Sequence, residues 1–178
     1  MNLDELYLRV YGDPVLRVRT QEVTGFPIPA PLIERMFEIM YEEEGVGLAA
    51  CQAGSEQRLM ILDVPEEDGT PAFRGVIANP DITDRNGEQR GEEGCLSFPG
   101  IREDITRSDW IRVRARNERG EPIEFEARGL LSRAVQHELD HLDGVLFIDR
   151  MSPVRRRLLA KKLKRIASDR VSARAVNE

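Results

Sequence analysis

The segment Gln136-His137-Glu138-Leu139-Asp140-His141 contains both histidines of the chain, four residues apart, with a glutamate directly after the first. On a helix, residues i and i+4 lie one above the other, so both imidazoles would point the same way and could bind one metal ion. This HExxH pattern is typical of metal-dependent hydrolases, in which the glutamate acts as general base. Two surface histidines on an ordinary amphipathic helix are the simpler alternative, which a third ligand elsewhere would argue against.

The residues that precede this segment predict a helix over 130–142 and, before it, a β-hairpin with one solvated face. Along the helix, four residues fall on nearly one line: Leu130, Ala134, His137 and His141. In the hairpin, apolar and charged residues alternate from Trp110, a turn follows at 117–120, and alternation resumes from Ile123. Glutamates of the returning strand lie opposite the arginines of the first, which favours a solvated, charge-paired sheet face over a nucleic-acid site.

Length and composition favour one compact, cytoplasmic domain. The chain has 178 residues, of which 40% are apolar, enough to bury a core. It begins with an acidic, broken segment and contains no run of eighteen apolar residues, so we expect neither an export signal nor a membrane partner. Residues 153–178 carry nine Arg and Lys against two acidic residues, a charge of +7, whereas the whole chain carries −6.

Further elements can be placed along the chain. A helix is expected from Pro31 to a glycine stop at Gly45, and buried strands are expected at 58–64 and 75–79. A polar loop is expected at 65–71, a shaped loop at 91–100 and a short strand-like run at 145–148. A last helix is expected from Pro153, with Leu159, Leu163 and Ile166 as its apolar stripe. After the first helix, residues 45–50 read G-x-G-x-x-A. This sequence follows a helix rather than a strand, which argues against a dinucleotide site and leaves Gly45 and Gly47 as a helix stop and a tight turn.

A catalytic divalent metal needs three protein ligands and one open position. His137 and His141 supply two, and the third could be Cys95, Cys51 or a carboxylate. Both cysteines are expected to be free thiols or ligands rather than a disulfide in a reducing compartment. Spacing alone does not choose between them.

Three separated blocks together resemble the signature blocks of the peptide deformylase family. They are Gly45-Val46-Gly47-Leu48-Ala49-Ala50-Cys51-Gln52, Glu93-Gly94-Cys95-Leu96-Ser97 and Gln136-His137-Glu138-Leu139-Asp140-His141-Leu142. The similarity extends from Gly12 to the run at 145–148, across nearly the whole chain. It implies a single deformylase domain over 1–178, with residues 153–178 as a basic C-terminal helix and tail.

The resemblance also implies an activity and a set of site residues. Deformylases remove the N-formyl group from the initiator methionine of new proteins and release formate. By this likeness Cys95, His137 and His141 bind the metal, Glu138 is the general base, and the Gln52 amide and the Leu96 backbone N–H stabilise the oxyanion. The residues implied in substrate binding are Val46, Gly47, Arg102, Arg133 and Ala134.

Two departures from the family pattern concern the surroundings of this site. Cys51 stands where the family usually has proline. Arg133 and Gly91 match positions where better-known members carry apolar residues that line the methionine pocket. The shape of that pocket is therefore less determined by the resemblance than the chemistry is.

The resemblance further implies Fe(II) as the native cofactor, with zinc, nickel or cobalt able to replace it. The expected partners are N-formyl-methionyl nascent peptides and, through the basic helix, the ribosome, but not DNA. The expected fold is α+β, with small antiparallel or mixed β-sheets packed around a central HExxH helix, an N-terminal helix and a C-terminal helix.

Two other functions compete with deformylation. A zinc peptidase with HExxH usually has a third His or Glu ligand downstream, and here no other histidine exists and little chain follows His141. A non-catalytic metal- or peptide-binding protein would have no need of Glu138 or Gln52.

Overall fold

The computed structural model describes residues 5–65 and 73–176, with side chains up to residue 169. Its helices are α1 (Ala30–Glu42), α2 (Gly129–Leu142) and α3 (Pro153–Val176), and its 3₁₀ segments are η2 (Pro14–Arg17), η3 (Ala50–Ala53) and η4 (Phe147–Asp149). Its strands are β1 (Gly47–Ala49), β2 (Leu59–Val64), β3 (Phe73–Asn86), β4 (Gln89–Gly94), β5 (Arg102–Arg107), β6 (Trp110–Arg116) and β7 (Pro122–Arg128).

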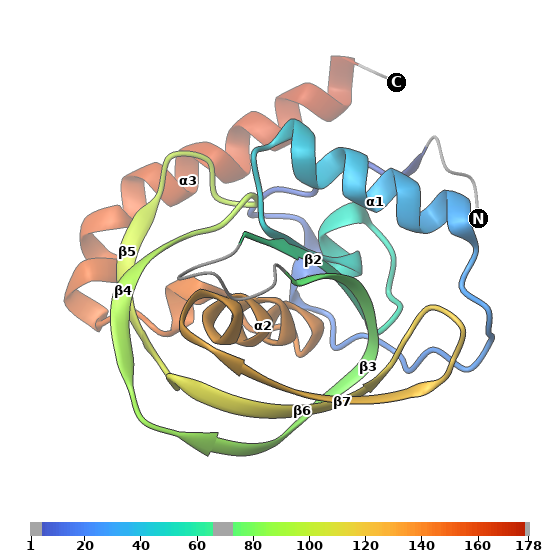
Figure 1. Cartoon of the computed structure of the whole chain (residues 1–178). Coiled ribbons are helices and arrows are strands. Elements are labelled where there is room, and N and C mark those ends of the chain that lie inside the picture. The colour runs from blue at the N-terminus through green and yellow to red at the C-terminus, as the bar shows by residue number, and fades with distance from the viewer. Residues whose placement is uncertain (1–4, 66–72, 177–178) are drawn as a thin grey trace.

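The strands form a five-stranded sheet of order β1-β2-β3-β6-β7 and a two-stranded sheet of β4 and β5. All these strand pairs are antiparallel, and one isolated parallel bridge joins Gln21 to Gln57. Figure 1 shows α2 enclosed by the curved strands, with α1 and α3 on the outside. The predicted α+β fold around a central HExxH helix, with N- and C-terminal helices, is confirmed.

The apolar core falls into three clusters, and α2 borders the central one. The first cluster joins the buried face of α1 to β1 and β2, and the second lies between the large sheet and α2. The third lies beneath α3, where Leu163 and Ile166 are buried and Leu159 is partly buried, as their spacing predicted. Every residue of α2 from Ser132 to Leu142 is buried. A helix buried on all sides must satisfy its polar groups inside the protein.

The segment after α1 differs from the predicted helix stop and tight turn. Glu44, and not a glycine, adopts the left-handed conformation, with φ of 55°. The Gly45 N–H donates to the Met40 carbonyl at 2.9 Å, and Gly47 begins β1. Within the G-x-G-x-x-A sequence, Gly47, Leu48 and Ala49 form an edge strand that pairs with β2 alone in the described sheet, so these residues do not form a phosphate-binding turn between a strand and a helix.

Three further predictions of local structure were wrong or incomplete. β3 continues well beyond the expected 75–79 because a register shift between Ala78 and Asp81 accommodates Pro80, which has no N–H to donate. The first residues of the expected loop at 91–100 lie in β4, paired with β5. The run at 145–148 leads into η4 instead of a strand. The expected polar loop at 65–71 falls, after Pro65, outside the described residues.

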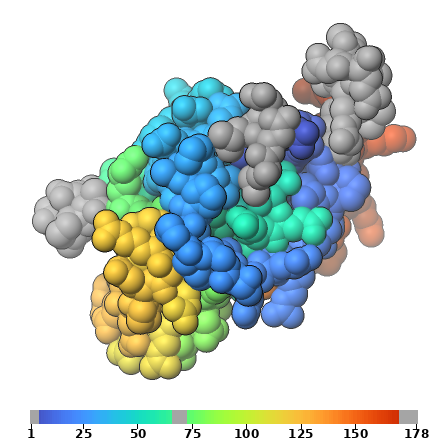
Figure 2. Space-filling model, turned by 90° about the vertical axis from the view of Figure 1, so that its right-hand side faces the viewer, coloured from blue at the N-terminus to red at the C-terminus, as the bar shows by residue number. Residues whose placement is uncertain are grey.

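The hairpin of β6 and β7 is confirmed, as is its charge-paired face. Arg112 pairs with Glu126 at 3.2 Å and Arg114 with Glu124 at 2.8 Å. The turn of the hairpin meets the segment before α1, where the Ile28 N–H donates to the Glu118 carbonyl at 2.8 Å. In Figure 2 the yellow hairpin lies against this blue segment. No helix of the described chain is long and apolar enough to cross a membrane.

Candidate metal centre and catalytic site

The structure brings Cys95, His137 and His141 together. His137 and His141 lie one turn apart on α2, with ring centroids 5.0 Å apart, and Cys95 lies directly after β4. One ligand atom from each of the three residues lies within 4.8 Å of the other two, and Cys95 Sγ is 3.2 Å from His141 Nε2. One thiolate and two imidazoles that converge in this way fit a single divalent ion.

The ring of His137 is held by a carboxylate on the strand that leads to Cys95. His137 Nδ1 lies 3.0 Å from Glu93 Oε2, and Arg107 donates to both Glu93 oxygens, at 2.7 and 2.9 Å. Burial alone would raise the pKa of the Glu93 carboxyl, but the bonds from Arg107 and His137 outweigh it and hold the pKa well below its usual range. Glu93 is therefore ionised, and it can fix the His137 ring in a metal-binding orientation.

His141 has no such support at its second nitrogen. Its Nδ1 is buried without a hydrogen-bond partner among the described residues. Burial, together with the charges of His137 and Arg107, lowers the pKa of His141 well below its ordinary value. The imidazole is thus neutral, which is the form that binds a metal.

The carboxylate of Glu138 is buried on α2, directly after His137 in the chain and against β1 at Gly47. Its Oε2 has no hydrogen-bond partner in the described part of the chain. Burial raises the pKa of Glu138 to about 7, against the opposing effects of the His137 charge and the Ala49 N–H. A carboxylate with such a pKa and a free oxygen can accept a proton and return it near neutral pH.

Gln52 reaches the same place from the 3₁₀ segment η3. The Ala49 N–H donates to its Oε1 at 2.9 Å, which fixes the orientation of the amide. Its Nε2 then points toward the Cys95 region, 3.1 Å from Ser97 Oγ and 3.7 Å from Cys95 Sγ. An amide held in this way is a preorganised hydrogen-bond donor at the candidate metal site.

The remaining residues predicted for the site lie at different depths around it. Val46 and Gly47 lie at the start of the edge strand β1, and a Cβ on Gly47 would come within 2.7 Å of Glu138 Oε1. Leu96 follows Cys95 and packs against the first core cluster. Arg102 is exposed and pairs with Glu92, whereas Arg133 and Ala134 are buried on α2.

Two residues that organise this site are not predicted from the sequence. Glu93 belongs to the second of the three family-like segments but has no predicted role, although its position two residues before a candidate ligand is a usable signal. Arg107 is buried between Glu93 and Asp140, 2.7 and 2.5 Å away. No local pattern marks Arg107, because its partners are 14 and 33 residues distant in sequence.

A buried HExxH helix, facing a thiolate and an oriented amide within an α+β fold, defines a metal-dependent hydrolase. The family model described as polypeptide deformylase matches residues 6–157. The chain is 50% identical over 162 residues to a peptide deformylase of Thermotoga maritima, covering 90% of this chain and 95% of that protein. It is 44% identical over 160 residues to peptide deformylase 2 of Xanthomonas campestris, covering 88% and 92%.

Solved structures agree with these relatives. The crystal structure of peptide deformylase from Thermus thermophilus superposes with a TM-score of 0.82 at 40% identity, covering 92% of this chain and 99% of that one. The chain therefore belongs to the polypeptide deformylase family. Its reaction is the hydrolytic removal of the formyl group from nascent peptides, and the family depends on a metal.

Proposed function

We propose that this chain deformylates the initiator formyl-methionine of nascent polypeptides with Cys95, His137 and His141 as metal ligands. The convergence of these three donors beside the buried Glu138 carries the proposal. A divalent ion bound there would act as a Lewis acid and lower the pKa of a bound water. Fe(II) is the proposed native ion, by likeness to the family, and zinc, nickel or cobalt would fit the same donors.

The protein groups would divide the remaining chemistry among them. Glu138 Oε2 takes a proton from the attacking water as the oxygen adds to the formyl carbon. The formyl oxygen, which becomes negatively charged, accepts hydrogen bonds from Gln52 Nε2 and from the Leu96 backbone N–H. Glu138 then delivers its proton to the departing amine as the C–N bond breaks, so that water and formyl-peptide become formate and a free N-terminus.

The edge strand β1 offers a docking place for the peptide. β1 pairs with β2 along one edge, through Gly47, Leu48 and Ala49, and has no strand on its other edge in the described sheet. An extended peptide added to this edge would form backbone hydrogen bonds that do not depend on its sequence. This suits an enzyme that must process many different chains.

Formate release from a formyl-Met tripeptide, measured with metal-loaded protein prepared without oxygen, tests the proposal. Wild-type protein should release formate, and Glu138→Gln should lower kcat by about 10²–10⁴-fold while binding the same amount of metal. Glu124→Gln, on the exposed hairpin, is the matched control and should behave as wild type. Undiminished turnover in Glu138→Gln would exclude Glu138 as the base, and no formate from wild type would exclude the function.

We further propose that α3 brings the enzyme to the ribosome in the cytoplasm. Arg157, Lys161 and Lys164 are exposed on α3 and have no acidic partner among the described residues. Positive charge of this kind binds RNA in a salt-dependent way. Changing all three to Gln should abolish co-sedimentation with ribosomes at low salt, whereas changing Arg74, Arg90 and Arg119 to Gln should not. An equal loss of co-sedimentation in both triple variants would mean that the net charge of the protein, and not the position of these residues on α3, causes the binding.

A further inference from the structure

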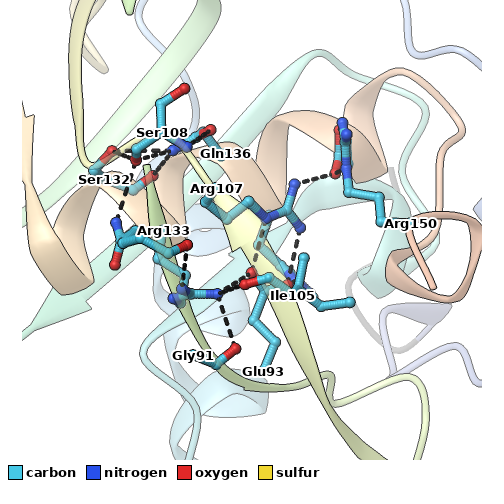
Figure 3. A network of polar contacts seen from close by, with 12 residues as sticks. Gly91, Glu93, Ile105, Arg107, Ser108, Ser132, Arg133, Gln136 and Arg150 are labelled. Atoms are coloured by element: carbon cyan, nitrogen blue, oxygen red, sulfur yellow. Dashed lines mark hydrogen bonds and ion pairs between the residues drawn. The ribbon is translucent and has the colours of Figure 1, made fainter. Parts of the chain in front are cut away.

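Arg133 is a buried cation on α2 that the proposed reaction does not use. It lies one helical turn before His137, and its side chain is only 9% exposed. Its guanidinium donates to the Ile105 carbonyl at 2.9 Å, to the Gly91 carbonyl at 3.3 Å and to the Gln89 carbonyl at 3.3 Å. These contacts attach α2 to both strands of the hairpin β4–β5, as Figure 3 shows for Gly91 and Ile105.

Gly91 supplies the space that this guanidinium occupies. A Cβ at residue 91 would lie 3.2 Å from Arg133 Nη2, closer than most side-chain contacts. The arginine therefore fills the volume that a side chain at residue 91 would otherwise take. Gly91 and Arg133 are therefore a matched pair, in which the missing side chain of one residue leaves the space that the other occupies.

The same guanidinium also reaches the carboxylate that supports the metal site. Arg133 Nη1 lies 3.0 Å from Glu93 Oε1, while His137 Nδ1 lies 3.0 Å from Glu93 Oε2. Two residues one turn apart on α2 thus hold the two oxygens of one carboxylate on β4 (Figure 3 shows the Arg133 contact). Glu93 precedes Cys95 by two residues. These two contacts therefore join the helix that carries both histidines to the strand that leads to Cys95.

We propose that Arg133 is a positioning residue for the metal centre, which acts through Glu93 to align Cys95 with His137 and His141. The inference rests on the proposed assignment of these three residues as ligands. Arg107 also binds Glu93, and from β5 it reaches Asp140 of α2. Arg133 lies on α2 itself, one turn before His137, so it adds a second cationic link between the two elements that supply ligands. Partners beyond the metal ligands typically change metal affinity by about 10–100-fold.

Two substitutions separate positioning of Glu93 from simple support of the hairpin. Arg133→Lys keeps a cation for Glu93 but loses most bonds to the strand carbonyls, while Arg133→Gln keeps amide donors but no charge. The dissociation constant of Co(II) is measured by competition with a chromophoric chelator, and the visible spectrum of the Co(II)–thiolate site is recorded. Thermal unfolding of each variant and the kcat and KM for a formyl-Met tripeptide are measured in parallel.

Arg133→Gln should weaken Co(II) binding about tenfold or more, alter the Co(II) spectrum and lower kcat with KM within about twofold of wild type. Arg133→Lys should stay within about threefold of wild type in Co(II) affinity, although its unfolding temperature falls. Arg90→Gln, in an exposed ion pair 3.4 Å from Asp104 on the same hairpin, is the control and should change none of these values. In a Glu93→Gln background, Arg133→Gln should weaken Co(II) binding no further.

Wild-type Co(II) affinity in Arg133→Gln, or equal weakening in the Lys and Gln variants, would overturn the inference. A raised KM with unchanged Co(II) affinity in Arg133→Gln would also overturn it and would indicate that Arg133 binds substrate. The variant Cys95→Ser distinguishes failure of the proposed metal site from failure of the positioning role. If Cys95→Ser binds Co(II) as tightly as wild type, the proposed metal site itself is wrong. If Cys95→Ser binds weakly while Arg133→Gln resembles wild type, only the positioning role is wrong.

Discussion

Cys51 and Cys95 lie close to the same site but in different chemical surroundings. Cys95 is partly exposed among nitrogen donors, whereas Cys51 is fully buried, with its Sγ 3.4 Å from the His141 carbonyl. Burial, reinforced by the charge of Glu138, raises the pKa of Cys51 to about 12. Because the thiolate is the reactive and metal-binding form, Cys51 is suited to packing and not to ligation.

A thiol titration checks this difference between the two cysteines. In the Cys95→Ser variant at pH 8, Ellman's reagent should detect no fast-reacting thiol in the native protein and one thiol after denaturation. In wild-type protein stripped of metal, Cys95 should react within minutes. Rapid native labelling of the Cys95→Ser variant would show that Cys51 is accessible and that it competes for the metal.

His137, Glu138 and His141 could be singled out from the sequence because they stand in one short helical pattern, whereas Cys95 and Gln52 were assigned only through the resemblance to the family. His137, Glu138 and His141 are fixed relative to one another by the helical repeat alone. Glu93 and Arg107 acquire their roles only when β4 and β5 pair and pack on α2. Such roles depend on contacts between distant parts of the chain, which no local spacing encodes.

The edge strand β1 has no room for a side chain at its first residue. A Cβ on Gly47 would come within 2.7 Å of Glu138 Oε1 and 2.8 Å of a Leu62 methyl group. Gly47→Ala should therefore displace Glu138 and lower kcat by about 10–100-fold, because small misplacements of catalytic groups have effects of this size. It should also reduce the free energy of unfolding by about 1–3 kcal/mol through overpacking.

Gly75→Ala is the matched control for this prediction. Gly75 lies on β3 and pairs with Leu62 of β2, yet a Cβ there would meet Phe73 at an ordinary 3.4 Å. Its kcat should remain within about twofold of wild type, measured by formate release, with unfolding followed by circular dichroism. A Gly47→Ala variant that is equally active would mean that β1 can shift without moving Glu138.

Elements with a regular local repeat were predicted well, and irregular ones were not. The hairpin β6–β7 and the helices α1, α2 and α3 follow from alternation or helical spacing. The sequence predicts a loop in place of β4 because Gly91 and Gly94 are typical of loops, although Gly91 leaves the space that Arg133 fills. It predicts an end of β3 before Pro80 because only the pairing with β6 reveals the register shift there.

In the molecule as a whole, the candidate metal site lies where the two-stranded sheet meets α2. Cys95 follows the two-stranded sheet, while His137 and His141 belong to the helix packed on the five-stranded sheet. The strand order β1-β2-β3-β6-β7 places β4 and β5, which lie between β3 and β6 in sequence, in a sheet of their own. This arrangement cannot be predicted from the sequence alone. A metal bound to Cys95, His137 and His141 would add a cross-link between the hairpin β4–β5 and α2.

A ligand that binds the folded state but not the unfolded state stabilises the protein by an amount set by its concentration and its dissociation constant. At a free metal concentration a thousand times the dissociation constant, the gain is about 4 kcal/mol. For a domain of this length, each kcal/mol raises the unfolding temperature by about 2–4 °C. Removing the metal with a chelator should therefore lower the unfolding temperature by about 8–16 °C, and adding Zn(II) or Co(II) back should restore it.

In Cys95→Ser the chelator should have little effect, whereas Cys51→Ala should retain the full shift. A full drop of the unfolding temperature in Cys95→Ser would mean that the metal binds elsewhere. No drop in wild type would mean that the contacts of Glu93 with Arg133 and His137 hold the hairpin β4–β5 to α2 without a metal.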